Sequence, residues 1–131
     1  YFDEHALFFE GIYQRNWNDL ASLIHEITNY LLLALNIRTK IESSSSLKPT
    51  AKKTDLILEL CKKVSAKTYL SGPFGRHYLE QEKFEDAGIQ LQFHEYNHPL
   101  YQQAHADFEP YMSVIDLLFN HGPKSLEILC T

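Results

Sequence analysis

The chain has 131 residues, enough for one modest domain with a hydrophobic core. Its 17 acidic residues outnumber its 12 lysines and arginines and give a net charge of -5, so the basic surplus typical of nucleic-acid-binding proteins is missing. The longest apolar run, residues 30–35, is too short to span a bilayer. These properties predict a cytoplasmic protein without a membrane span and disfavour nucleic acid as a partner.

The first half of the chain contains two helical patterns and one strand pattern. Residues 2–13 are rich in aromatic side chains and are expected to be helical. Asn16 is a suitable cap for a second helix, which ends at Asn36 and carries an apolar stripe of Trp17, Leu20, Leu23, Ile24, Ile27, Leu31 and Leu35. Residues 37–41 alternate apolar and basic side chains, which predicts a half-buried strand followed directly by four serines.

The second half alternates helix and strand patterns. Residues 50–64 predict an amphipathic helix, residues 67–70 a strand, and residues 78–87 a helix that Gly88 terminates. Residues 89–93 alternate as a third strand, and a polar, aromatic connection follows to about residue 110. Ser113 is expected to cap a last long helix that ends at Gly122, with a short helix after it.

Three strands separated by helices predict an α/β domain over residues 1–131. Helical crossovers favour a parallel sheet of at least three strands with flanking helices, which we expect to be part of a larger three-layer domain. The carboxyl ends of parallel strands lie at one edge of the sheet. The segments 43–46, 71–76 and 94–103 are therefore expected to line one rim, where Ser43 and Ser44 would contact the substrate.

The segment 69–76, which reads Tyr-Leu-Ser-Gly-Pro-Phe-Gly-Arg, predicts an anion-binding loop. Backbone N–H groups near a helix start attract anions, and a guanidinium adds a bidentate contact. Ser71, Gly72, Gly75 and Arg76 are therefore the candidate ligands for a phosphate or carboxylate. The alternative is a Gly-Pro turn followed by an ordinary surface arginine.

A second group of candidate residues lies further along the chain. His98, Tyr101 and Gln103 have the polar groups that suit sugar hydroxyls or proton transfer, with His98 as the candidate acid or base. Asp116 lies in an apolar helix and would need a partner such as Arg76 or His98 if it were buried. The alternative for His98, Tyr101 and Gln103 is that they belong to a loop with a purely structural role. Metal binding by the histidines at 94, 98 and 105 is disfavoured because Pro99 interrupts the strand, so no metal site is predicted.

Known signatures of other enzyme classes are missing from the sequence. It has no Gly-rich dinucleotide fingerprint, Walker loop, nucleophile elbow or paired-cysteine motif. Its two cysteines are read as reduced thiols, since Cys61 lies on an apolar helix face and Cys130 is one residue from the end. Hydride transfer and P-loop chemistry are therefore disfavoured, and no cofactor is identified.

Several ordered segments resemble one known family. They read Lys-Thr-Asp-Leu-Ile-Leu-Glu-Leu-Cys-Lys from residue 53, Tyr-Leu-Ser-Gly-Pro-Phe-Gly-Arg-His-Tyr-Leu from residue 69, Ala-Gly-Ile from residue 87, His-Pro-Leu-Tyr-Gln-Gln from residue 98 and Ser-Val-Ile-Asp-Leu-Leu-Phe-Asn-His-Gly from residue 113. In this order they resemble the WbqC-like proteins of bacteria. Members usually begin with a Gln-Pro-x-Tyr-x-Pro-Trp type segment, which is absent here, so the chain is expected to correspond to the C-terminal half of the family domain.

The resemblance implies a role in the synthesis of O-antigen or other surface polysaccharides. Under this hypothesis the protein is a transferase that acts on an activated sugar or a similar anionic small molecule such as a nucleotide-sugar. Arg76 would hold its phosphate, His98 and Asp116 would be catalytic, and Tyr101 and Gln103 would contact the substrate. The alternative is a non-catalytic binding or assembly module, in which Phe2, Phe8, Phe9 and Tyr13 form an interface with a partner or a second copy.

Overall fold

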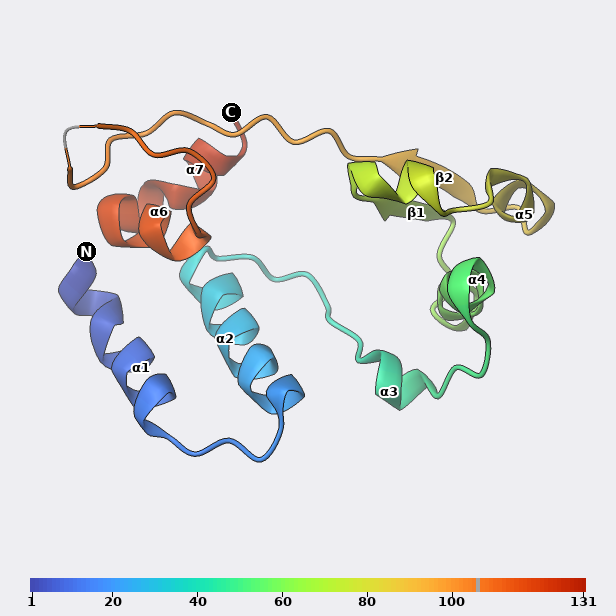
Figure 1. Ribbon diagram of the computed structural model, residues 1–131, viewed down its shortest axis with the longest axis horizontal. Coiled ribbons are helices and arrows are strands. Elements are labelled where there is room, and N and C mark those ends of the chain that lie inside the picture. Colours follow the sequence, from blue (N-terminus) through green and yellow to red (C-terminus); the bar gives the residue numbers. More distant parts are fainter. Residues whose placement is uncertain (106) are drawn as a thin grey trace. The chain divides into compact units, whose positions relative to one another are not determined.

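The computed structural model describes residues 1–105 and 107–131. The chain divides into two compact units (Figure 1), residues 1–39 together with 98–131 and residues 40–97. The first unit combines the blue and red parts of the chain, and the second contains the green and yellow parts. Two compact units can still belong to one domain, so the single domain over residues 1–131 stays a prediction.

The first unit is helical and has an aromatic core. Phe8 of one helix stacks on Tyr30 of the next with ring centroids 3.6 Å apart, and the His5 Nδ1 lies 2.7 Å from the Tyr30 hydroxyl. Phe9 is buried and packs edge-on against both Tyr30 and Phe119. The helices are α1 (Phe2–Gln14), α2 (Leu20–Ala34), α6 (Val114–His121) and α7 (Ser125–Leu129), with a 3₁₀ turn at Gly122–Lys124.

The ends of these helices agree with the predicted caps except at the start of α2. Ser113 caps α6 by accepting a hydrogen bond from the Ile115 N–H. The cap of α2 is Asp19, whose carboxylate accepts from the Ser22 N–H at 2.7 Å, and the predicted cap at Asn16 is wrong. The helix begins later because Trp17 belongs to the α1–α2 connection, where its indole N–H donates to the Ile12 carbonyl.

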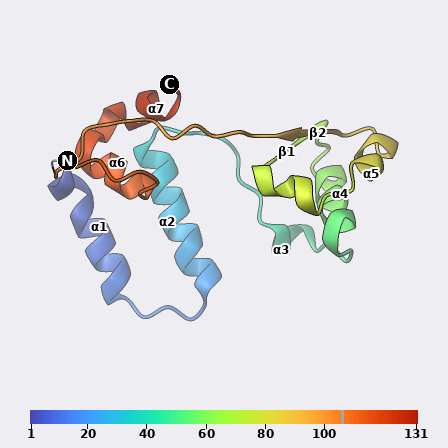
Figure 2. The same cartoon turned by 45° about the horizontal axis from the view of Figure 1, so that its top comes forward.

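The second unit packs helices against a pair of parallel strands. Its elements are α3 (Ser44–Leu47), α4 (Lys53–Lys63), β1 (Thr68–Ser71), the 3₁₀ turn η1 (Pro73–His77), α5 (Gln81–Asp86) and β2 (Gln90–Phe93). Along the chain β1 comes between α4 and α5, and β2 follows α5. Figure 2 shows the two strands side by side. The core consists of Leu58 and Cys61 of α4, Phe84 of α5 and Ile89 before β2. In register, Tyr69 lies opposite Leu91.

The predicted sheet of three or more strands is wrong for the residues that the structure describes, because only β1 and β2 pair. The expected strand at residues 37–41 has no regular secondary structure and pairs with neither strand of the sheet. Alternation alone does not make a strand, since the backbone also needs a neighbour for its N–H and C=O groups. The serine segment also differs from the expected loop, because Ser44–Leu47 forms one helical turn. Membership of a larger three-layer domain stays a prediction.

Neither unit contains a candidate membrane span. No helix in the described ranges combines the length and the apolar character needed to cross a bilayer.

Replacing Gly75 by alanine is expected to destabilise the second unit by about 1–3 kcal/mol. Gly75 is buried, and a Cβ at this position would lie 2.1 Å from the Ser71 Oγ and 3.0 Å from a Leu79 methyl carbon. Gly11 is the control, because a Cβ there would meet nothing within 4 Å. Urea denaturation followed by circular dichroism measures the change, and a Gly75→Ala variant as stable as wild type would contradict the packing described.

Candidate functional site

The carboxyl ends of β1 and β2 lie side by side, as a parallel pair requires. Ser71 lies opposite Phe93 at the end of the register, and the His94 N–H donates to the Ser71 carbonyl at 2.8 Å. The segments that follow the two strands therefore begin at the same edge. The predicted rim segment 71–76 and the first residues of segment 94–103 are brought together here. The serine segment 43–46 has no preceding strand.

Arg76 lies at this edge with its guanidinium over an aromatic ring. Its Cζ is 4.4 Å from the centroid of Phe93, and its Nη2 donates to Glu95 Oε1 at 2.7 Å. The side chains of Arg76 and Glu95 are 51% and 76% exposed. Exposed ion pairs contribute only about 0–1 kcal/mol, so an anionic ligand with better geometry can compete with Glu95 for the guanidinium.

The other predicted anion ligands divide into two kinds. Ser71 is 4% exposed and its hydroxyl donates to the Gly72 carbonyl at 3.1 Å, while Gly75 is buried against Ser71. These two residues pack the turn. Gly72 is exposed, and a Cβ built on it would meet nothing within 4 Å. Of the four predicted anion ligands, Arg76 and the Gly72 backbone are therefore the two that a ligand can reach.

A second cluster forms around Asp116 in the first unit. Its Oδ2 accepts from the Tyr101 hydroxyl at 2.9 Å and from the Gln103 side-chain amide at 3.0 Å, and its Oδ1 accepts from the Asn120 amide at 3.2 Å. The structure thus joins Asp116 to two of the predicted substrate residues. The suggested pair of Asp116 with Arg76 stays a prediction, because the two residues belong to different units.

Gln103 closes the loop that contains it. Its Nε2 donates to the Glu109 carbonyl at 2.9 Å as well as to Asp116, and its Oε1 accepts from the Glu109 N–H at 2.8 Å. Both atoms of the amide are therefore used within the protein. This favours the structural alternative for Gln103, and substrate contact by this side chain stays a prediction.

His98 lies among aromatic rings. Its ring centroid is 5.1 Å from that of Tyr111, 5.9 Å from that of Tyr101 and 6.0 Å from that of Phe108. His98 and Asp116 thus have Tyr101 as a common neighbour. This packing anchors the segment after residue 98, and the acid or base role of His98 stays a prediction.

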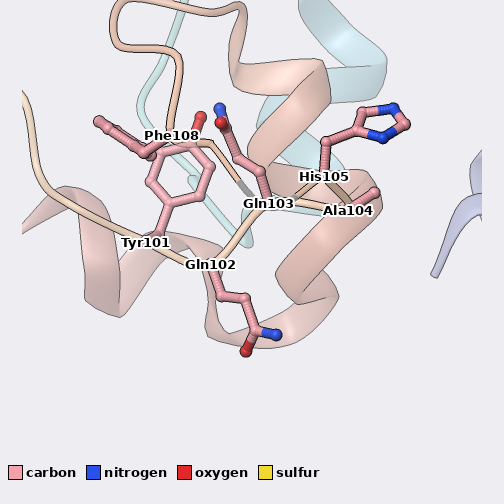
Figure 3. Close-up of a pocket in the computed structure, with 6 residues that line it drawn as sticks. All are labelled: Tyr101, Gln102, Gln103, Ala104, His105 and Phe108. Carbon is pink, nitrogen blue, oxygen red and sulfur yellow. The ribbon is translucent and has the colours of Figure 1, made fainter.

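An open pocket of about 390 Å³ lies beside this cluster (Figure 3). Its lining residues are Tyr101, Gln102, Gln103, Ala104, His105 and Phe108. The rings of Tyr101 and Phe108 lie together, whereas Gln102 and His105 project in different directions. The polar groups do not converge on one point, which is the arrangement expected of a loop surface rather than of a catalytic centre.

The predicted substrate residues Ser43 and Ser44 lie in the second unit. The Ser43 hydroxyl is 2.7 Å from that of Ser45, and Ser44 lines an open, mostly apolar pocket of about 290 Å³. Cys61 also borders this pocket, and burial raises the pKa of its thiol. A raised pKa keeps the thiol protonated and disfavours a nucleophilic role. Substrate contact by the two serines stays a prediction.

The described part of the chain has no group of three or more histidine, cysteine or acidic side chains placed to hold a metal ion.

Sequence reasoning missed Phe93 and Glu95, the residues that position Arg76. Side chains two residues apart along an extended segment point to the same face. Phe93 and Glu95 could therefore both contact a side chain near the end of β1. The alternation of apolar and polar side chains over residues 89–93 was visible in the sequence. What the sequence did not specify is the register that places Ser71 opposite Phe93 and brings Arg76 to this face.

Comparison with known proteins identifies the class to which this chain belongs. The model of the WbqC-like protein family matches residues 1–128, and the chain belongs to this family. Because the match begins at residue 1, it does not confirm the expectation that the chain corresponds only to the C-terminal part of the family domain.

One curated relative is the Uncharacterized protein Rv1507c of Mycobacterium tuberculosis strain H37Rv. It is 30% identical over 131 residues, which cover 98% of this chain and 57% of the relative. The chain thus spans less than two thirds of the length of that protein. No solved structure matches the chain.

Proposed function

We propose that the protein binds an activated, anionic sugar at the carboxyl ends of β1 and β2 and acts as a transferase in the synthesis of bacterial surface polysaccharide. Arg76 contacts the phosphate of the ligand, and the exposed backbone at Gly72 borders the same site. The polysaccharide role comes from the WbqC-like family resemblance, and the family membership supports it.

The observation that carries the proposal is the environment of Arg76. Its guanidinium lies over the Phe93 ring at the edge where ligands of parallel α/β sheets bind, and it pairs with the largely exposed carboxylate of Glu95. A guanidinium that is held over an aromatic ring is oriented before a ligand arrives, which lowers the entropy lost on binding. Charge-assisted hydrogen bonds to such a group contribute about 1.5–3 kcal/mol.

A thermal-shift screen of the full chain tests the proposal. The ligands are nucleotide-sugars, nucleoside diphosphates and inorganic pyrophosphate, and Arg76→Ala is expected to weaken the affinity for any ligand that binds by about 10–100-fold. Arg15→Ala is the matched control. Arg15 also pairs with an exposed carboxylate, Glu26, and also lies over an aromatic ring, Trp17, but in the first unit.

The two variants separate binding at the strand ends from a general effect of charge. Equal loss of the ligand shift in Arg15→Ala and Arg76→Ala, or binding unaffected by Arg76→Ala, would overturn the proposed site. Transfer itself is tested by mass spectrometry of the bound nucleotide-sugar in the presence of sugar acceptors, where release of the nucleotide with formation of a new glycosidic bond is expected.

Exposed apolar side chains on α1 and α2 favour the alternative of an assembly module. Leu7 and Tyr13 are each 77% exposed and Leu33 is 78% exposed, whereas Phe8 and Phe9 of the predicted interface pack inside the unit. Surfaces of this kind mark contacts with other proteins. Light scattering over a range of concentrations tests it. A dimer that persists at nanomolar concentration and binds no small molecule supports assembly, and a monomer at all concentrations contradicts it.

A further inference from the structure

The second unit has the chain order of a nucleotide-binding βαβ element. β1 is followed by a turn with glycines at 72 and 75, then by α5 and the parallel strand β2, and Glu95 comes two residues after β2 ends. In βαβ units that bind nucleotides, an acidic residue about twenty positions beyond the glycine turn accepts hydrogen bonds from the ribose hydroxyls. Glu95 occupies the corresponding place at the end of the second strand.

Glu95 keeps acceptor capacity beside its ion pair. Its Oε1 accepts from Arg76 at 2.7 Å, and the side chain is 76% exposed. An ionised carboxylate has about four lone-pair sites on its two oxygens, so the contact with Arg76 leaves positions for two hydroxyl donors. The Arg76 guanidinium can therefore bind a phosphate while the neighbouring Glu95 carboxylate accepts hydrogen bonds from the two hydroxyls of a ribose.

Gly72 is a glycine that the fold of this unit does not require. Its φ of -66° is accessible to any residue, and a Cβ there would meet nothing within 4 Å. Gly75, in contrast, is required by its close contact with Ser71. A glycine without a conformational or packing role, at the end of a strand, leaves the backbone open to close approach by a ligand.

We propose that the carboxyl ends of β1 and β2 form a subsite for a ribonucleoside diphosphate, in which Glu95 binds the ribose hydroxyls and Arg76 binds the diphosphate. Gly72 provides the space through which the phosphates approach the backbone. The inference rests on the proposed function, because it requires an anion at Arg76. It adds the ribose as the recognised group and the ribonucleoside diphosphate as the class of carrier.

Calorimetric titration of the full chain tests the subsite with three kinds of probe: inorganic pyrophosphate, the four common ribonucleoside diphosphates and their 2′,3′-dideoxy counterparts. Wild type is expected to bind at least one ribonucleotide about tenfold more tightly than its dideoxy counterpart, since a charge-assisted hydrogen bond is lost. Glu95→Ala is expected to abolish this preference while pyrophosphate still binds. Gly72→Val is expected to weaken nucleotide binding while the melting temperature stays that of wild type.

The outcomes separate this inference from the proposed function. Pyrophosphate binding that depends on Arg76, together with equal affinity for ribo and dideoxy nucleotides, would overturn the ribose subsite and leave the anion site standing. A ribose preference that persists in Glu95→Ala would also overturn it. Failure of every probe to bind would overturn both. Glu85→Ala is the matched control, because this glutamate is exposed on α5 of the same unit and is bonded to Gln81.

Discussion

Replacing Phe84 by alanine is expected to lower the free energy of unfolding by about 3–5 kcal/mol. The Phe84 side chain is 0% exposed and stacks on Tyr69 of β1 with centroids 5.7 Å apart. It also belongs to the core with Leu58 and Ile89, so it joins α4, α5 and the strand pair. Its loss leaves a cavity and removes the largest buried ring of the second unit. Urea denaturation of the full chain measures the change.

Phe74→Ala is the matched control for this prediction. Phe74 is 76% exposed on η1 of the same unit, and surface substitutions of this kind usually change stability by less than about 0.5 kcal/mol. Equal destabilisation by the two substitutions would contradict the packing described for Phe84. If Phe84→Ala also weakens pyrophosphate binding, the strand ends that carry Arg76 depend on this core, because β1 rests on Phe84 through Tyr69.

Replacing Asp116 by alanine is expected to lower the free energy of unfolding by about 2–3 kcal/mol, since hydrogen bonds to charged groups contribute about 1.5–3 kcal/mol each and the site is partly exposed. The Asp116 carboxylate accepts from Tyr101, Gln103 and Asn120. Its removal leaves these half-buried donors to find other partners. Thermal and urea unfolding measure the effect, and Tyr101→Phe is expected to cost less because it removes one of the three bonds.

Glu127→Ala is the control for Asp116→Ala. Glu127 is an exposed carboxylate on α7 of the same unit, and its loss is expected to change stability by less than about 0.5 kcal/mol. A double-mutant cycle of Asp116→Ala with Tyr101→Phe measures the coupling between the two side chains. Additive effects of the two substitutions would show that their hydrogen bond contributes nothing to stability.

The helices could be predicted from the sequence because their signals are local. Ser113, Gly88 and Gly122 act as caps or stops through their own backbone and side-chain geometry, and the structure confirms each of them. The predicted strand at residues 37–41 was wrong because the alternating pattern is a local property of the sequence, whereas strand formation is not local. A strand exists only where another backbone pairs with it, and no sequence period specifies that partner.

The candidate site was predicted in part for the same reason. Arg76 follows a predicted strand, so its place at a strand end could be inferred from chain order. The contact of Arg76 with Glu95 spans 19 residues along the chain and depends on the parallel register of β1 and β2. The loop closure by Gln103 depends equally on a tertiary contact with Asp116.

Mapping of ligand contacts by nuclear magnetic resonance tests the central claim most directly. Inorganic pyrophosphate is titrated into the isotope-labelled full chain, and the backbone amide shifts are followed residue by residue. We predict saturable changes confined to residues 72–77 and 93–96, which Arg76→Ala abolishes and Arg15→Ala preserves. Changes centred on residues 101–108 and 116, or no saturable change at all, would contradict an anion site at the ends of β1 and β2.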